Sequence, residues 1–156
     1  MSATLQKIVS GGQTGVDRAA LDAAMAAGLE VAGWCPRGRR AEDGIIADRY
    51  PLEETPQRDY RQRTEWNVRD ADGTLVLYWG ELHNGTLATV RFARDTHRRP
   101  LLLVNLLEPL GVREAAKWVA DNDIQTLNVA GPRESSRRGI YRMAYDYLET
   151  LFREAL

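Results

Sequence analysis

The sequence has 156 residues, of which 44% are hydrophobic and 28% are charged, and its formal net charge is −1. This length predicts one domain over 1–156, and the near-neutral charge argues against nucleic acid or an anionic membrane as a partner. No apolar run reaches the roughly 20 residues that span a bilayer, residues 1–12 lack a signal-peptide layout, and the single cysteine, Cys35, excludes an intramolecular disulfide. We therefore expect a cytoplasmic protein.

Short apolar runs alternate with amphipathic segments along the whole chain. In the first half we expect a strand over 5–10, a helix over 14–27, a strand over 29–34, a polar loop over 35–57, a helix over 59–70 and a strand over 74–79. In the second half we expect a helix over 84–97, a strand over 100–106, a helix over 112–123, a strand over 126–130 and a closing helix over about 138–154. The closing helix carries Tyr141, Tyr145 and Phe152 outside its main apolar stripe, which favours an apolar face for a dimer.

This alternation predicts an α/β fold. We expect a Rossmann-like, doubly wound and mainly parallel sheet of about five or more strands, with helices on both faces. The pattern leaves the order of the strands open. In such sheets ligands bind outside the carboxyl ends of the strands, so the loops from strand to helix are the segments where we expect function.

Three of these loops begin with glycine and lead into a helix. The free N–H groups and the dipole of a helix N-terminus favour anions, and glycine allows a ligand to approach the backbone closely. The loops therefore predict a pocket for a phosphate-bearing molecule. The candidate residues are Gly11, Gly12, Gln13, Thr14, Gly15 and Asp17 in the first loop, Asn84, Gly85 and Thr86 in the second, and Gly131, Arg133, Glu134 and Ser135 in the third.

The first loop matches neither the P-loop, because it has no lysine, nor the GxGxxG pattern, because its glycines stand at 11, 12 and 15. A tight turn with close packing of helix and strand is the alternative explanation for these glycines. Asp17 fits two roles equally well: a carboxylate favoured by the helix dipole, or an acceptor for a ligand hydroxyl.

The stretch CPRGRRAEDG, in the long loop over 35–57, joins a basic cluster to an acidic pair. Long loops without regular structure are often functional, so Arg37, Arg39 and Arg40 are candidates for a mobile lid over the pocket; a solvated charged loop is the alternative. Cys35 is either a reactive thiolate or metal ligand, or a buried and inert residue. No spacing of histidines, cysteines and acids predicts a metal site, and the two histidines stand apart.

Six stretches taken together resemble one known family. They are SGGQTGVDRAALDAA (10–24), GWCPRGRRAEDG (33–44), YPL (50–52), RTEWNV (63–68), NGT (84–86) and LNVAGPRES (127–135). The combination is similar to the "putative molybdenum carrier" family, a circularly permuted YpsA-like branch of the SLOG superfamily that is related to Lonely Guy proteins. The resemblance implies a Rossmann-like fold, a homo-oligomer (dimer or tetramer), and a pocket for a nucleotide-like or pterin-phosphate ligand.

The resemblance suggests a carrier whose bound cargo is molybdenum cofactor or a nucleotide derivative. Lonely Guy phosphoribohydrolases, by contrast, use a PGGxGTxxE pattern whose glutamate assists N-glycosidic cleavage. Ala88 and Thr89 stand where that acid is wanted, and nothing in the sequence positions Glu42, Asp43 or Glu134 to replace it. We therefore favour binding over hydrolysis; the alternatives are an N-glycosidase of the Lonely Guy type and a nucleotide-sensing module.

Overall fold

Five parallel strands form the central sheet of the computed structural model, which describes residues 4–156. Their order is β2-β1-β9-β7-β8. The strands are β1 (Lys7–Val9), β2 (Glu30–Ala32), β7 (Gly73–Tyr78), β8 (Leu101–Asn105) and β9 (Thr126–Ala130). The predicted parallel α/β sheet is thus confirmed, and its strand order is now defined. Residues 1–3 of the expected single domain lie outside the described part of the chain.

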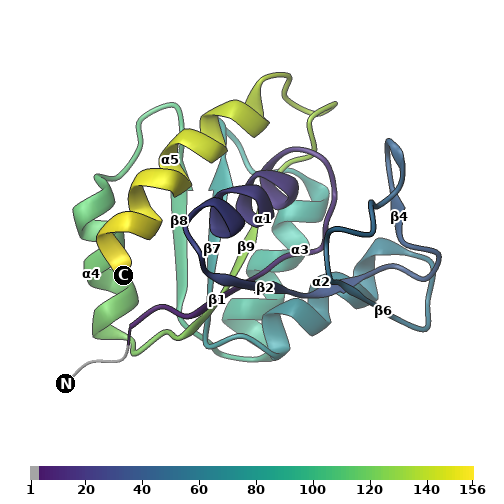
Figure 1. The fold of residues 1–156 in the computed structure, drawn as a ribbon, viewed down its shortest axis with the longest axis horizontal. Helices are drawn as coiled ribbons and strands as arrows, with labels where there is room; N and C mark the ends of the chain where they lie inside the picture. The colour runs from purple at the N-terminus through teal and green to yellow at the C-terminus, as the bar shows by residue number, and fades with distance from the viewer. Residues whose placement is uncertain (1–3) are drawn as a thin grey trace.

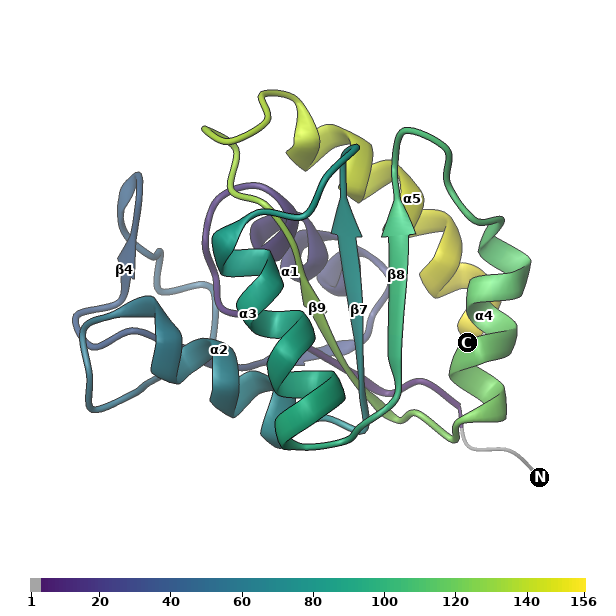
Figure 2. The same cartoon turned by 180° about the vertical axis from the view of Figure 1, so that it is seen from behind.

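Helices cover both faces of this sheet, as a doubly wound fold requires. One face carries α1 (Val16–Ala26), α4 (Val112–Asp121) and α5 (Ile140–Ala155), which lie in front of the sheet in Figure 1. The other face carries α2 (Tyr60–Arg69) and α3 (Asn84–Arg91), which lie in front in Figure 2. Among the described residues, no helix is long and apolar enough to cross a membrane.

The main core lies between the sheet and the helices α1, α4 and α5. Ala19, Ala20, Ala23 and Ala24 of α1 are at most 1% exposed, and their small side chains allow α1 to pack closely on the sheet and on α5. Phe152 is fully buried in this core, so the expectation that it belongs to an exposed dimer face was wrong.

The expected helix over 84–97 is divided. It is α-helical as far as Arg91 and continues as a π-helix, η1 (Phe92–Thr96). Phe92 and Ala93 of the π-helical turn are buried and pack with Val68 of α2. η1 therefore packs on α2, and both elements belong to the layer that covers the second face of the sheet.

The expected strand over 29–34 is interrupted at Gly33. Gly33 has φ +138°, and a Cβ there would lie 2.2 Å from the carbonyl oxygen of Ser10. The chain leaves the main sheet at this point and continues as β3 (Trp34–Cys35), which pairs with β6 (Glu53–Glu54). A close approach of two backbones therefore ends β2 early.

The expected loop over 35–57 contains regular structure. Besides β3 and β6 it holds a hairpin of β4 (Arg40–Ala41) and β5 (Gly44–Ile45). Its buried residues Cys35, Ile46, Tyr50 and Leu52 pack with Leu21 of α1 into a second core. The expectation of a loop without structure was wrong, because strands of two residues are too short to show hydrophobic periodicity.

Candidate functional site

The three glycine-led segments lie on one edge of the sheet. β1, β9 and β7 are adjacent and parallel, so the segments that follow them all begin at the carboxyl edge. The chain continues from β1 and β9 to helices on one face, and from β7 to α3 on the opposite face (Figures 1 and 2). Such a change of side between β9 and β7 is where open α/β sheets bind their ligands.

A cavity of about 470 Å³ lies at this position. Its wall is built from the sheet edge, the N-terminal part of α3 and one side of α2. Half of the predicted site residues line it: Gly11, Gln13, Asp17, Asn84, Gly85, Thr86, Gly131 and Arg133. The other half do not: Gly12, Thr14, Gly15, Arg37, Arg39, Arg40, Glu134 and Ser135.

Sequence reasoning missed the contribution of α2. The missed lining residues are Tyr60, Arg61, Arg63, Thr64 and Asn67 of α2, with His83, Ala88, Thr89, Asn128, Ala130, Pro132 and Ser136 elsewhere. Positions 60, 63, 64 and 67 recur at helical spacing and form one polar stripe. A polar stripe usually faces solvent, so only its position opposite the glycine loops could have marked it as part of a site.

A buried ion pair forms part of the cavity wall. Arg63 Nη1 lies 2.9 Å from Asp17 Oδ2, and the two side chains are 11% and 7% exposed. Burial raises the pKa of the Asp17 carboxyl, and the adjacent Arg63 guanidinium opposes that shift. Asp17 therefore holds the guanidinium of Arg63 in place beside the cavity.

Gly11 is required by this arrangement. A Cβ at Gly11 would lie only 1.7 Å from Arg63 Nη1, so the guanidinium lies directly against the backbone of the loop. The absence of a side chain at Gly11 makes room for a cation of the protein itself. This contact explains one glycine of the first loop by packing and places a positive charge at the cavity.

Two asparagines on the cavity side have structural partners. The Asn67 side chain accepts from the Trp34 amide at 2.8 Å and donates to the Trp34 carbonyl at 2.9 Å, which fixes α2 to β3. Asn128 of β9 is 2% exposed and donates to Thr74 Oγ1 of β7 at 3.3 Å. These bonds hold the floor and one wall of the cavity in a defined geometry.

The N-terminus of α3 forms another part of the wall. The first hydrogen bond of the helix is donated by the Leu87 amide to the His83 carbonyl, so the amides of residues 84–86 have no partner within the helix. Thr86 is only 7% exposed and lines the cavity. Free amides and the positive end of the helix dipole make this end of α3 suitable for an anion.

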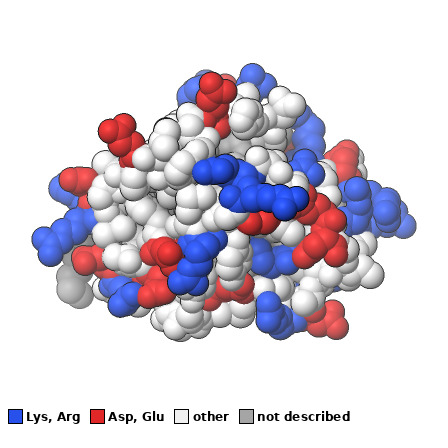
Figure 3. Space-filling view, turned by 90° about the horizontal axis from the view of Figure 1, so that it is seen from above, with Lys and Arg blue, Asp and Glu red and all other residues white. Residues whose placement is uncertain are grey.

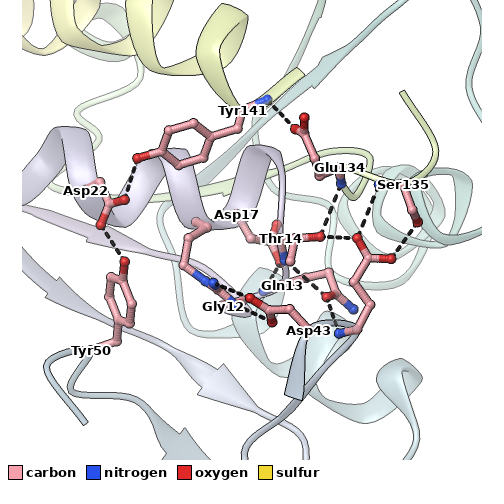
Figure 4. A network of polar contacts seen from close by, with 12 residues as sticks. Gly12, Gln13, Thr14, Asp17, Asp22, Asp43, Tyr50, Glu134, Ser135 and Tyr141 are labelled. Atoms are coloured by element: carbon pink, nitrogen blue, oxygen red, sulfur yellow. Dashed lines mark hydrogen bonds and ion pairs between the residues drawn. The ribbon is translucent and has the colours of Figure 1, made fainter. Parts of the chain in front are cut away.

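The α1 side of the same edge is closed by hydrogen bonds (Figure 4). Thr14 Oγ1 accepts from the Glu134 amide and donates to the Glu42 carboxylate. Glu42 also accepts from the Ser135 amide and hydroxyl. Partial burial raises the pKa of Glu42, but the hydrogen bonds from Ser135 and Thr14 together lower it by more. The pKa of Glu42 is therefore below its ordinary value. Glu42 thus bridges the first and third glycine-led segments.

The other residues of this closed side also have intramolecular roles. Arg18 forms an ion pair with Asp43 at 3.0 Å and donates to the Gly12 carbonyl. The Glu134 carboxylate accepts from the amides of Gly139 and Tyr141 at 2.6 and 2.9 Å, and so caps α5. These acids therefore stabilise the edge rather than face the cavity.

Gly12 and Gly15 are explained by packing. A Cβ at Gly12 would lie 2.6 Å from Leu52 Cδ1, and one at Gly15 would lie 2.4 Å from the Pro132 carbonyl oxygen. Both residues also have positive φ angles, +76° and +79°. The close-packing explanation of these two glycines is thus the one that the geometry supports.

The arginines expected to form a lid have different surroundings. Arg39 donates to the carbonyls of Ile46, Ala47, Tyr50 and Leu52, so it holds the segment 46–52 together. The exposed Arg37 donates its amide to the Gln57 carbonyl. Arg40 donates to the Arg58 carbonyl, and its guanidinium carbon lies 5.1 Å from the centroid of the Tyr60 ring. Only Arg40 therefore lies beside a residue that lines the cavity.

Cys35 is fully buried in the second core. Burial raises the pKa of its thiol, which disfavours the reactive thiolate. Within residues 4–156 no group of three or more His, Cys, Asp or Glu side chains is placed to hold a metal ion. The surroundings of Cys35 fit the inert alternative.

Charges of both signs are distributed over the carboxyl edge of the sheet. Figure 3, which looks down on this edge, shows basic side chains interleaved with acidic ones rather than one basic field. Of the described residues that line the cavity, only Asp17 carries a carboxylate. The cavity itself therefore combines several guanidinium groups with a single acid that is already paired with Arg63.

Comparisons with known proteins agree with this architecture. Residues 8–152 match the model of the circularly permutated YpsA SLOG family. The chain is also similar to the crystal structure of a "Putative molybdenum carrier protein" from Syntrophus aciditrophicus SB, with 41% sequence identity, 97% of each chain covered and a TM-score of 0.90. No curated protein matches the chain.

Proposed function

The chain belongs to the circularly permutated YpsA SLOG family, and on that premise we propose that it is a cytoplasmic binding or carrier protein whose cavity holds a phosphate-bearing small molecule. The observation that carries the proposal is that the N-terminus of α3 and the guanidinium of Arg63 line the same cavity. Amides at a helix N-terminus and a guanidinium are both donors suited to phosphate oxygens.

The size and chemistry of the cavity suit a nucleotide or a pterin phosphate. Its volume of about 470 Å³ falls within the roughly 300–1,000 Å³ of small-molecule sites. Thr89 and Asn128 add polar groups to the wall. The solved relative is named a molybdenum carrier, so molybdenum cofactor is a candidate cargo, held through its phosphate and its ring.

The positions of the acids favour binding over hydrolysis. Glu42, Asp43 and Glu134, the acids considered as catalytic substitutes, bond to Ser135, Arg18 and the N-terminus of α5 respectively. Asp17 lines the cavity but is bonded to Arg63. An acid free to act on a glycosidic bond is therefore not among the described residues of the wall, and general acid–base catalysis needs such a group.

Isothermal titration tests the proposal. We expect micromolar binding of AMP, GMP or molybdenum cofactor to the intact chain, with the nucleotides recovered unchanged. Arg63→Met should weaken binding at least about tenfold, the loss of one charge-assisted hydrogen bond. Arg69→Met is the matched control, because Arg69 lies on the same helix and pairs with Asp70 outside the cavity.

Three outcomes would contradict the proposal. They are the absence of micromolar binding for all of these molecules, unchanged affinity in Arg63→Met, and release of free base from the nucleotides, which would support the N-glycosidase. Thr86→Val tests the same cavity without disturbing the Asp17–Arg63 pair. The proposal therefore remains testable if Arg63→Met fails to fold.

We further propose that the protein assembles into a homo-oligomer. β8 is an edge strand, and Leu103, Leu107 and Leu110 on it and just beyond it are 39%, 58% and 38% exposed. Light scattering on the purified chain should give the mass of a dimer or tetramer. A monomer at micromolar concentration would contradict this proposal.

A further inference from the structure

Three guanidinium groups surround one aromatic ring beside the cavity. The guanidinium carbons of Arg40, Arg63 and Arg133 lie 5.1, 5.1 and 6.0 Å from the centroid of the Tyr60 ring. They come from β4, α2 and the segment after β9, which are far apart in the sequence. We call these four residues the Tyr60 cluster.

The positive charge of the Tyr60 cluster is only partly balanced. Asp17 pairs with Arg63, while Arg40 donates to a backbone carbonyl, which carries no net charge. The charge of Arg133 contributes to the lowered pKa of Glu42, but the oxygens of Glu42 accept hydrogen bonds from Thr14 and Ser135. Like charges gathered around one ring repel one another, and an anion bound beside them would relieve the repulsion.

The N-terminus of α3 is a second feature suited to an anion, separate from the Tyr60 cluster. It belongs to a different element, and it offers backbone amides and the buried Thr86 side chain rather than guanidinium groups. Arg133 and Tyr60 line the same cavity as this helix end. One bound molecule can therefore contact both features.

We propose that the ligand carries two phosphate groups, one at the N-terminus of α3 and one within the Tyr60 cluster. A nucleoside diphosphate or a nucleoside bisphosphate has this chemistry, whereas a monophosphate has no second phosphate for Arg40 and Arg133. This inference rests on the proposed function and adds to it the number of anionic groups that the cavity recognises.

Titrations with AMP, ADP, adenosine 3′,5′-bisphosphate and inorganic phosphate test the inference. We expect ADP or the bisphosphate to bind at least about tenfold more tightly than AMP, because each added phosphate gains charge-assisted hydrogen bonds. The preference should decrease as salt is added, since salt screens the charges of the exposed Arg133 and the partly exposed Arg40. Which of the two molecules binds more tightly shows whether the phosphates are joined or separate.

Variants of the cluster locate the effect. Arg133→Gln and Arg40→Gln should each reduce the ratio of ADP or bisphosphate affinity to AMP affinity several-fold. Arg113→Gln is the matched control, because Arg113 is exposed on α4, which covers the opposite face of the sheet from α2 and α3. Arg40 and Arg133 lie outside the hydrophobic cores, so we expect Arg40→Gln and Arg133→Gln to fold, and thermal unfolding checks this.

The outcomes separate this inference from the proposed function. If AMP binds with micromolar affinity and the two-phosphate molecules bind no more tightly, the second phosphate position is wrong and the binding function stands. An unchanged affinity ratio in Arg133→Gln and Arg40→Gln would also overturn it. If none of the four molecules binds, this inference is overturned, and the titrations with GMP and molybdenum cofactor then decide the proposed function.

Discussion

The two sides of the carboxyl edge use similar glycine-led sequences for different purposes. On the α1 side, Thr14 and Ser135 each donate to the Glu42 carboxylate, and Gly15 packs against the Pro132 backbone. On the α3 side, Gly85 has no heavy atom within 4 Å of a Cβ position, and the amides of the helix end face a cavity. Glycine thus serves internal packing on one side and access to the backbone on the other.

The largest expected effect comes from the same substitution made on each side. Gly15→Ala places a Cβ 2.4 Å from the Pro132 carbonyl oxygen at a φ of +79°, so we expect a loss of about 3 kcal/mol or more in unfolding free energy. A Cβ at Gly85 has no heavy atom within 4 Å, and alanine in a helix is more stable than glycine by roughly 0.5–1 kcal/mol. We therefore expect Gly85→Ala to leave the unfolding free energy unchanged or to raise it. Urea unfolding measures both, and equal effects would contradict the comparison.

A smaller effect is expected from two aspartates that each pair with an arginine. Asp17→Asn leaves the buried Arg63 without its charged partner, at a cost of about 3 kcal/mol. Asp43→Asn breaks the pair with Arg18, in which the Asp43 side chain is 50% exposed, and should cost under about 1 kcal/mol. Thermal unfolding distinguishes the two, and a larger cost for Asp43→Asn would show that the closed side, not the cavity wall, holds the critical pair.

The smallest expected effect is the pH dependence of the Glu42 bridge. The folded-state pKa of Glu42 lies below its ordinary value of 4.5, so the stabilisation is present above about pH 4.5 and is lost as the pH falls through the folded-state pKa. Because Glu42 is exposed, Glu42→Gln should lower stability near pH 7 by at most about 1 kcal/mol, and the difference should narrow below pH 4. Glu108→Gln, an exposed control, should show neither effect.

A difference between Glu42→Gln and the wild type that grows as the pH falls would contradict this account. It would mean that protonation of Glu42 strengthens the bridge to Thr14 and Ser135, the opposite of what the lowered pKa implies. Unfolding midpoints measured from pH 3 to pH 7 give the sign directly.

Much of this architecture could be predicted from the sequence. The apolar runs around Ile8, Leu75 and Leu127 are long enough to show strands, and alternation with helices dictates a parallel sheet. The parallel sheet in turn brings the loops after β1, β7 and β9 to one edge. The family resemblance, carried by motifs over most of the chain, pointed to the same fold.

The parts that could not be predicted depend on contacts between distant segments. Glu42 bonds to Ser135 across 93 positions, and no local pattern shows such a contact. The polar stripe of α2 looks like a solvent face until Arg63 is seen against Gly11. The glycines at 12 and 15 fit phosphate binding and packing equally well in sequence, and only the atoms around them distinguish the two.

The measurement that tests the central claim most directly is a titration of the ¹⁵N-labelled protein with ADP, followed by amide chemical shifts. We predict the largest shifts at the amides of Gly85, Thr86 and Gly131, which line the cavity, and small shifts at Thr14 and Glu42 on the closed side. Shifts confined to Thr14, Glu42 and their neighbours, or no shifts at millimolar ADP, would contradict the claim that the α3 side of the edge is the binding site.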